Sequence, residues 1–267
     1  MKPCLFLFAV TLSVGVSPCL RGQVSGGTPG RLEVVRSWSA KEANQGVAVD
    51  ATHFYVIDDR ALGKYEKATG RKVAQWTASA GSGVIHMNAG IVAGGSLIVA
   101  HSNFPSKPDE SSLEYFDTVT LKPTGRKVFA NPVGSLTWAV PEGTGWLACF
   151  VHYKFNSDTA KSRIVRYDAD WKVLATWVFP PELVARFGSF SSSGGGLGLA
   201  GRVWVSGHDA KELYRLLLPE GGGVAKWEGT VAFVSNGQAF AWDPSQPTEL
   251  YSIQRKSREV IVSRLHE

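Results

Sequence analysis

The sequence predicts an all-β protein, a five-bladed β-propeller whose ring is closed by an N-terminal strand. A unit of about 45 residues, the length of a four-stranded propeller blade, occurs five times along the chain. The fifth unit lacks its fourth strand, and a strand of the missing kind stands near the N-terminus. The 29 glycines and 9 tryptophans agree with a turn-rich β-protein, because long helical patterns are nearly absent.

Each unit opens with a strand of small residues, which suits the crowded centre where the innermost strands of a propeller converge. These first strands are expected at residues 45–50, 88–93, 134–139, 195–199 and 237–242. Very apolar second strands are expected at residues 54–57, 97–100, 146–151, 203–206 and 250–253. Third strands with an aromatic–acidic pair include 64–66, 114–117 and 165–168, and fourth strands rich in Val and Trp include 73–76, 173–177 and 224–227.

The ends of the chain predict how the ring closes. The fifth unit supplies only three strands, of which the last spans residues 259–265. Residues 32–38 have the pattern of a fourth strand but precede the first unit. Pairing these two segments would complete the fifth blade and remove an open sheet edge.

The N-terminal segment predicts an exported protein, periplasmic or secreted. Residues 1–22 have the features of a signal peptide, with Lys2 followed by an apolar run at 5–16. This run is too short to span a bilayer comfortably, and no later segment could do so. Residues 23–30, rich in glycine, form a flexible lead-in, and residues 31–267 form the propeller domain.

The cysteines argue against a lipid anchor and against disulfide bonds. Pro18 stands where a lipoprotein signal requires a small residue, so we do not expect Cys19 to be acylated. If the signal peptide is removed after Cys19, Cys149 alone remains and no intrachain disulfide can form.

The formal net charge is +5 and the pI about 9.1. Lys and Arg are not concentrated as in nucleic-acid-binding patches, and the densest group, residues 255–258, is assigned to a loop at the predicted site. We therefore expect no binding to nucleic acid. We also expect a monomer.

Propeller geometry places the starts of the first strands and the ends of the second strands on one face, called here the top face. Polar or ionisable residues follow every second strand. His101, His152 and His208 occupy equivalent positions in units two, three and four, and His86 stands near the start of a first strand. Four of the six histidines are thus predicted at the top face.

A polar ligand site on this face follows from the pattern. The candidate catalytic residues are His86, His101, His152, His208 and Asp209. The candidate substrate-binding residues are Gln45, Asp59, Asn88, Asn103, Gln238 and Arg255. His101, His152 and His208 are also candidate ligands of one divalent metal ion, because imidazole binds zinc, copper, iron and nickel. Imidazole also serves as an acid or base near neutral pH.

Two questions remain open: whether the polar residues form a site at all, and what the long loop at residues 102–112 does. The polar residues could cap strand ends and satisfy backbone groups of the top loops. The long loop at residues 102–112 could be a lid or specificity loop over the site, or a plain excursion of the chain.

A set of short segments carries a resemblance to a known family. They lie at residues 86–90, 100–103, 134–138, 152–153, 207–209, 212–214, 237–238, 241–243 and 258–260. As a set they resemble a family of secreted microbial propellers often labelled cycloisomerase, over residues 44–264. The resemblance implies a propeller fold and export, and it brings no catalytic residues to this sequence.

Three kinds of function are compatible with these features. The first is an enzyme that acts on a small polar substrate of the sugar acid or lactone type, a lactonase or isomerase with or without a metal. The second is a non-catalytic module that binds carbohydrate or protein, with Phe104, Tyr153 and Trp242 as stacking surfaces. The third is a purely structural role, which would leave the histidines unexplained.

Overall fold

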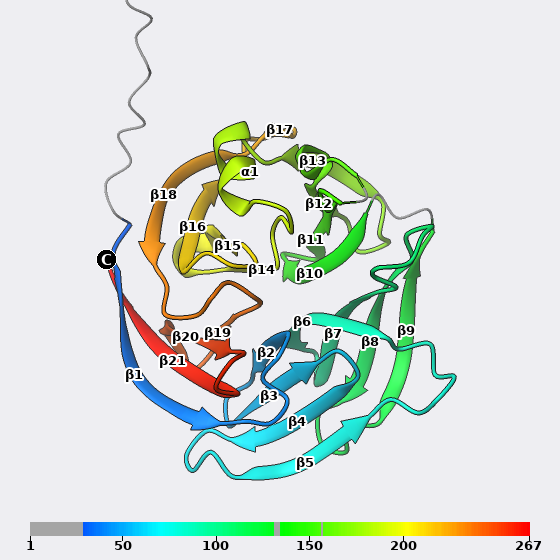
Figure 1. Ribbon diagram of the computed structural model, residues 1–267, viewed down its shortest axis with the longest axis vertical. Helices are drawn as coiled ribbons and strands as arrows, with labels where there is room; N and C mark the ends of the chain where they lie inside the picture. Colours follow the sequence, from blue (N-terminus) through cyan, green and yellow to red (C-terminus); the bar gives the residue numbers. More distant parts are fainter. Residues whose placement is uncertain (1–28, 131–133, 156) are drawn as a thin grey trace, which may run out of the picture.

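The computed structural model describes residues 29–130, 134–155 and 157–267, which form five small sheets arranged in a ring (Figure 1). Four sheets have four strands and one has five. The protein is a five-bladed β-propeller, so the predicted fold class is confirmed.

The strands follow one another blade by blade, with the innermost strand of each blade first. Blade 1 consists of β2 (Gly46–Val49), β3 (His53–Asp58), β4 (Ala61–Glu66) and β5 (Lys72–Thr77). Blade 2 consists of β6 (His86–Ala93), β7 (Ser96–Ser102), β8 (Ser111–Asp117) and β9 (Pro123–Phe129). Blade 3 consists of β10 (Ser135–Glu142), β11 (Gly145–Val151), β12 (Arg163–Tyr167), β13 (Val173–Val178) and β17 (Gly223–Val224).

Blades 4 and 5 complete the ring. Blade 4 consists of β14 (Gly194–Leu197), β15 (Val203–Ser206), β16 (Glu212–Leu217) and β18 (Lys226–Ala232). Blade 5 consists of β19 (Ala241–Asp243), β20 (Gln246–Gln254), β21 (Glu259–His266) and β1 (Arg31–Ser39). One α-helix, α1 (Pro181–Phe187), and two short 3₁₀ helices, η1 (Thr159–Lys161) and η2 (Leu199–Gly201), lie in the connections.

The N-terminal strand closes the ring as predicted. β1 pairs antiparallel with β21, from Arg31 opposite His266 to Ser39 opposite Glu259. Near the end of β1, the Trp38 ring stacks on Phe54 of blade 1, with ring centroids 5.0 Å apart. The closing strand therefore joins the last blade to the first through both backbone hydrogen bonds and aromatic packing.

Apolar clusters between neighbouring blades form the core. Successive residues of a strand point to opposite faces of its sheet, and each face packs on another blade. In β3, Phe54 and Val56 pack with residues of blade 5, whereas Tyr55 and Ile57 pack with residues of blade 2. Each second strand is buried on both faces, which explains why these strands are continuous apolar runs in the sequence.

Small residues are required where the innermost strands converge. A Cβ atom placed on Gly46 would lie 2.8 Å from the Cβ of Ala239, which belongs to a different blade. Such a contact is closer than real Cβ atoms make. The glycine-rich and alanine-rich first strands seen in the sequence therefore reflect the close approach of backbones at the propeller axis.

One fourth strand differs from the prediction at residues 224–227. Val224 belongs to β17, which pairs parallel with β13, and the fourth strand of blade 4 begins only at Lys226. The backbone N–H of Ala225 donates to the carbonyl oxygen of Val178, which holds the segment against blade 3. The sequence analysis also named no fourth strand for blade 2, because most of β9 is exposed and carries no apolar pattern.

The predicted signal peptide and most of the lead-in, residues 1–28, lie outside the described residues. Within the described residues, no helix is long and apolar enough to cross a membrane. Cys149 is a free, buried cysteine of β11, and its burial raises the pKa of the thiol to about 12.

Candidate functional site

The five innermost strands begin around a cavity of about 480 Å³, called here the top cavity. Each blade contributes one polar side chain from the start of its innermost strand or the residues just before it. These five residues are Gln45, Asn88, Thr137, Ser193 and Gln238. The cavity has the size of a small-molecule site, and this polar ring offers hydrogen-bonding groups around the propeller axis.

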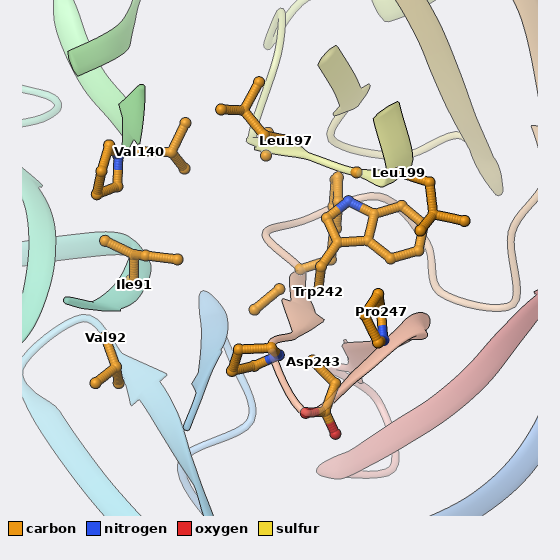
Figure 2. A pocket seen from close by; sticks show the side chains of 16 residues that line it. Ile91, Val92, Val140, Leu197, Leu199, Trp242, Asp243 and Pro247 are labelled. Atoms are coloured by element: carbon orange, nitrogen blue, oxygen red, sulfur yellow. The ribbon is translucent and has the colours of Figure 1, made fainter. Parts of the chain in front are cut away.

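The opposite ends of the innermost strands surround a second cavity of about 370 Å³, called here the bottom cavity (Figure 2). Its lining is mostly apolar and includes Ile91, Val140, Leu197 and Trp242. Trp242 therefore lies away from the top cavity, where the sequence analysis had placed it as a stacking residue. Among the described residues that line the bottom cavity, Asp243 alone is ionisable.

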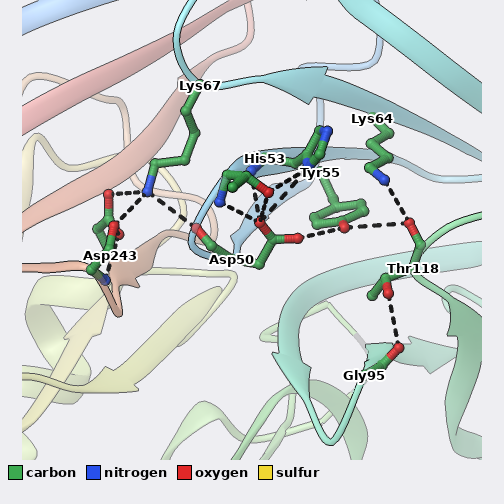
Figure 3. A network of polar contacts seen from close by, with 10 residues as sticks. Asp50, His53, Tyr55, Lys64, Lys67, Gly95, Thr118 and Asp243 are labelled. Carbon is green, nitrogen blue, oxygen red and sulfur yellow. Dashed lines mark hydrogen bonds and ion pairs between the residues drawn. The ribbon is translucent and has the colours of Figure 1, made fainter.

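Asp243 belongs to a network of hydrogen bonds and an ion pair that joins three blades (Figure 3). The Lys67 ammonium lies 2.5 Å from the Asp243 carboxylate and donates to the Asp50 carbonyl oxygen at 3.1 Å. The Asp50 carboxylate accepts from the Tyr55 hydroxyl at 2.7 Å, and that hydroxyl lies 3.4 Å from the carbonyl oxygen of Thr118 in blade 2. These contacts tie blades 5, 1 and 2 together, and they engage the carboxylate of Asp243 with protein partners.

The top cavity contains a histidine–aspartate pair. His86 lies at the start of β6 and Asp59 directly after β3, and their Nδ1 and Oδ1 atoms are 2.7 Å apart. The same Asp59 oxygen accepts a hydrogen bond from Gln45 Nε2 at 2.7 Å. Because Asp59 engages Nδ1, the Nε2 atom of His86 is the ring nitrogen that can exchange a proton with a ligand.

Asp59 is held in its charged form. Burial opposes its ionisation, but hydrogen bonds from His86 and Gln45 and the charge of Arg255 outweigh burial, so the pKa of Asp59 lies below its ordinary value. An ionised Asp59 keeps the proton of a neutral His86 on Nδ1 and stabilises the imidazolium that forms when Nε2 accepts a second proton.

Two guanidinium groups line the cavity and form no close ion pair with a carboxylate of the described residues, although the charge of Arg255 acts on Asp59. Arg255 Nε donates to Asn44 Oδ1 at 3.2 Å, and its NH1 atom lies 3.4 Å from His208 Nε2. Arg60 donates to the backbone carbonyl oxygens of Ala78 and Ser79. Among residues 29–130, 134–155 and 157–267, neither arginine has a carboxylate oxygen within 4.0 Å. Both charges are therefore available to an anionic ligand.

His208 lines the cavity beside Arg255, whereas Asp209 stands behind it. His208 Nδ1 lies 2.7 Å from Asp209 Oδ1, and the Asp209 side chain is 73% exposed. The imidazole stacks on the Phe190 ring, with centroids 4.2 Å apart and an interplanar angle of 25°. Asp209 thus orients a histidine of the cavity without lining the cavity itself.

The remaining wall is aromatic. Phe104, Tyr153 and Phe190 line the cavity, and Phe155 lies against all three. The Phe104 ring lies 5.1 Å from His86 and 4.6 Å from Tyr153. The cavity therefore has a charged and polar side, from blades 1, 2, 4 and 5, and an aromatic side, from blades 2, 3 and 4.

His101 does not belong to this cavity, contrary to its predicted role. Its side chain is buried, Nε2 accepts the backbone N–H of Ile85 at 3.1 Å, and Nδ1 lies 3.0 Å from Ser112 Oγ. Ser112 in turn donates to Glu114 Oε1 at 2.6 Å. Because β7 runs to Ser102, two residues beyond its predicted end, strand alternation turns His101 sideways and both ring nitrogens are occupied by protein partners.

The three predicted metal ligands are not brought together. His208 lines the top cavity, but His101 lines a different cavity and His152 lines neither of them. His152 directly follows β11, and its backbone N–H donates to Ser162 Oγ at 2.9 Å. In the described part of the chain, no three His, Cys, Asp or Glu side chains are arranged to hold a metal ion. The residues do not fit the divalent metal site expected from the sequence.

Asn103, predicted to bind substrate, instead forms hydrogen bonds that hold together the two ends of a loop. Its Nδ2 donates to the Pro108 carbonyl oxygen at 2.8 Å, and its Oδ1 accepts the Glu110 backbone N–H at 2.9 Å. This loop is the predicted lid or specificity loop, and it places Phe104 and Pro105 at the cavity wall.

Six of the residues that line the top cavity were not named as candidate site or stacking residues, among them Arg60, Thr137 and Phe190. Arg60 follows the Asp58–Asp59 pair and could have been found as part of the same polar strand end. Thr137 occupies the blade 3 position equivalent to Asn88, inside an expected first strand. Phe190 lies between α1 and β14 and has no periodic signal in the sequence.

Comparisons with known proteins show no family for this chain. No family model matches, and no curated protein matches. Among solved structures, a chain from the crystal structure of a mitotic checkpoint complex aligns with a TM-score of 0.45 and 9% sequence identity, covering 100% of both chains. A likeness at this level carries no argument about function.

The buried His101 predicts acid sensitivity of the fold. Burial lowers the pKa of His101 to about 4, with Glu114 raising it and Arg126 and His86 lowering it. Since the unfolded chain takes up this proton near pH 6.5, the free energy of unfolding should fall by about 3 kcal/mol between pH 6.5 and 4. His101→Gln should be less stable than the wild type at pH 7.5, and this difference should shrink by about 2 kcal/mol at pH 4.5. Urea unfolding across this pH range measures the free energy of unfolding of the wild type and of His101→Gln. If the two proteins showed the same dependence on pH, the predicted role of His101 would be contradicted.

Proposed function

We propose that this chain is an exported enzyme that binds a small anionic molecule in the top cavity and opens a lactone or ester bond by acid–base catalysis. The observation that carries the proposal is the 2.7 Å contact between Asp59 and His86 in a cavity of small-molecule size. The features of residues 1–22 support export.

The proposed reaction uses His86 as the group that moves the proton. His86 Nε2 takes a proton from water while the water oxygen forms a bond to the carbonyl carbon of the substrate. The bond between this carbon and the leaving oxygen then breaks, and His86 returns its proton to that oxygen. Asp59 stabilises the intermediate imidazolium, and no metal ion is required for these steps.

The arginines and the polar ring define the substrate's polar end. Arg255 and Arg60 have no carboxylate partner among the described residues, so a carboxylate of the substrate would pair with either of them. The side-chain amide nitrogen of Asn88 donates to the backbone carbonyl oxygens of His86 and Leu136, and that of Gln238 donates to the carbonyl oxygen of His208. Each amide thus keeps hydrogen-bonding capacity for substrate hydroxyl or carbonyl groups.

The proposal is tested by measuring the rate of lactone opening with a pH-stat, which titrates the acid released. The probes are D-saccharic acid 1,4-lactone and phthalide-3-carboxylic acid, which carry a carboxylate, and D-glucono-1,4-lactone and phthalide, which do not. We expect faster opening of at least one carboxylate-bearing lactone than of its neutral counterpart. His86→Asn should lower kcat about 10²- to 10⁴-fold with little change in KM, because it removes the proton carrier alone.

His53→Ala is the matched control, because His53 starts β3 at the end opposite Asp59 and its ring contacts Thr52. We expect its kinetics to equal those of the wild type. A His86→Asn variant with wild-type kcat, or a wild type that opens none of the four lactones, would contradict the proposed enzyme.

The aromatic wall favours a second candidate, a non-catalytic binding module. Phe104, Tyr153 and Phe190 could hold the apolar face of a carbohydrate without any bond being broken. Calorimetric binding of D-saccharate without opening of any of the four lactones would favour this alternative over the enzyme.

A further inference from the structure

We infer that the ligand of the top cavity carries a planar aromatic ring in addition to its anionic group. The inference rests on the proposed function, of which it specifies the substrate class. The observation behind it is an array of aromatic rings assembled from three blades on one side of the cavity.

The rings form a continuous surface. Phe104 comes from the loop after β7 and lies 4.6 Å from Tyr153, which follows β11. Tyr153 and Phe155 are stacked, with centroids 5.5 Å apart and an interplanar angle of 14°. Phe155 lies 6.0 Å from Phe190, which follows α1. Three separate connections therefore bring their aromatic residues to the same place.

Core packing accounts for only part of this array. Tyr153 belongs to a core cluster, and Phe104 and Phe190 pack against it but are only partly buried. Phe155 is 57% exposed. Exposed aromatic surface next to a polar cavity is typical of a binding site, because covering it with a ligand removes apolar area from water. Phe155 does not itself line the cavity, but its contacts with Phe104, Tyr153 and Phe190 extend the aromatic surface outward from it.

The chemistry of the wall distinguishes an aromatic ring from a sugar ring. A sugar can stack only the C–H face of its ring on phenylalanine side chains, which offer its hydroxyls no hydrogen-bonding group. An aromatic ring gains both apolar burial and the preferred tilted or stacked ring geometry. Arg255 and the Arg60 guanidinium also line the cavity, so one compact molecule could meet both chemistries. An aryl carboxylate, or its lactone or ester, has this combination.

Calorimetric titration with phenylacetate and cyclohexylacetate tests the inference without relying on turnover. The two acids have the same charge and nearly the same size, but only the first has an aromatic ring. We expect the wild type to bind phenylacetate about 3- to 10-fold more tightly, the range that aromatic pairing provides. Arg255→Gln should weaken the binding of both acids alike.

Phe155→Leu separates an aromatic contact from a merely apolar one. Its exposed position leaves the core intact, and it should reduce the preference for phenylacetate at least twofold while leaving the affinity for cyclohexylacetate unchanged. Leu174→Ala, at another exposed apolar residue, on β13, is the control and should change neither affinity. Equal affinities for the two acids, binding of neither, or a full preference in Phe155→Leu would overturn the inference. None of these results depends on His86, so the proposed lactone opening is tested separately, by the kinetics of His86→Asn.

Discussion

Deleting residues 23–40 should abolish the soluble, folded protein. The deletion removes β1, which pairs with β21 from Arg31 to Ser39. It leaves β21 as a long unpaired edge with an apolar run at residues 260–262, the kind of edge that recruits other chains. It also removes the Trp38 ring from its stack with Phe54 and Tyr251. We expect aggregates by size-exclusion chromatography and no cooperative thermal transition by circular dichroism.

Deleting residues 23–28 alone is the matched control, because β1 begins only at Arg31. This shorter deletion should leave the melting temperature unchanged. A protein lacking residues 23–40 that stayed monomeric with the wild-type melting temperature would refute the role of ring closure in stability.

Asp243→Ala should destabilise the fold by about 3 kcal/mol or more. The Asp243 side chain is 1% exposed and that of Lys67 is 14% exposed, so the ion pair is largely shielded from water. Removing the carboxylate leaves the Lys67 ammonium buried without its counter-charge, and also removes the acceptor for the backbone N–H and hydroxyl of Ser245. Urea unfolding at pH 7 measures the change in the free energy of unfolding.

A double-mutant cycle with Lys67→Met shows whether the pair itself is responsible. The double variant should be less destabilised than the sum of the two single variants, because it leaves no uncompensated charge. Asp209→Ala is the control, since its carboxylate is 73% exposed, and it should change stability by less than about 0.5 kcal/mol. Strict additivity in the cycle would show that Lys67 and Asp243 do not stabilise each other.

Most of the architecture could be predicted from the sequence because it depends on local patterns. Second strands that are apolar on both faces, as in β3 and β7, mark a sheet packed between two neighbours. The strands that differ from the prediction include one innermost strand, since a first strand was expected at residues 237–242 and β19 spans only Ala241–Asp243. The others are outermost strands. β9 is almost wholly exposed, and the start of β18 was displaced by the crossing of residues 223 and 224 to blade 3. Exposed strands carry little apolar signal, so their limits are settled by pairing partners.

The candidate site was predicted in part. Seven of the eleven residues predicted for the site line the top cavity: Gln45, Asp59, His86, Asn88, His208, Gln238 and Arg255. Those that follow a second strand, namely Asp59, His208 and Arg255, all lie beyond the last strand residue, where the chain is free to turn toward the axis. His101 lies within β7, and its side chain is therefore fixed by the strand.

The sequence by itself determined the number of blades, the order of their strands, the closing strand and the face on which polar residues gather. These features follow from periodicity and from the polarity of strand ends, which a chain carries locally. Only the tertiary structure decided which side chains meet. A difference of one residue in where a strand ends turns a side chain from the central channel to the space between blades. The aromatic wall arises from loops of three different blades, and no local pattern relates Phe104 to Phe190.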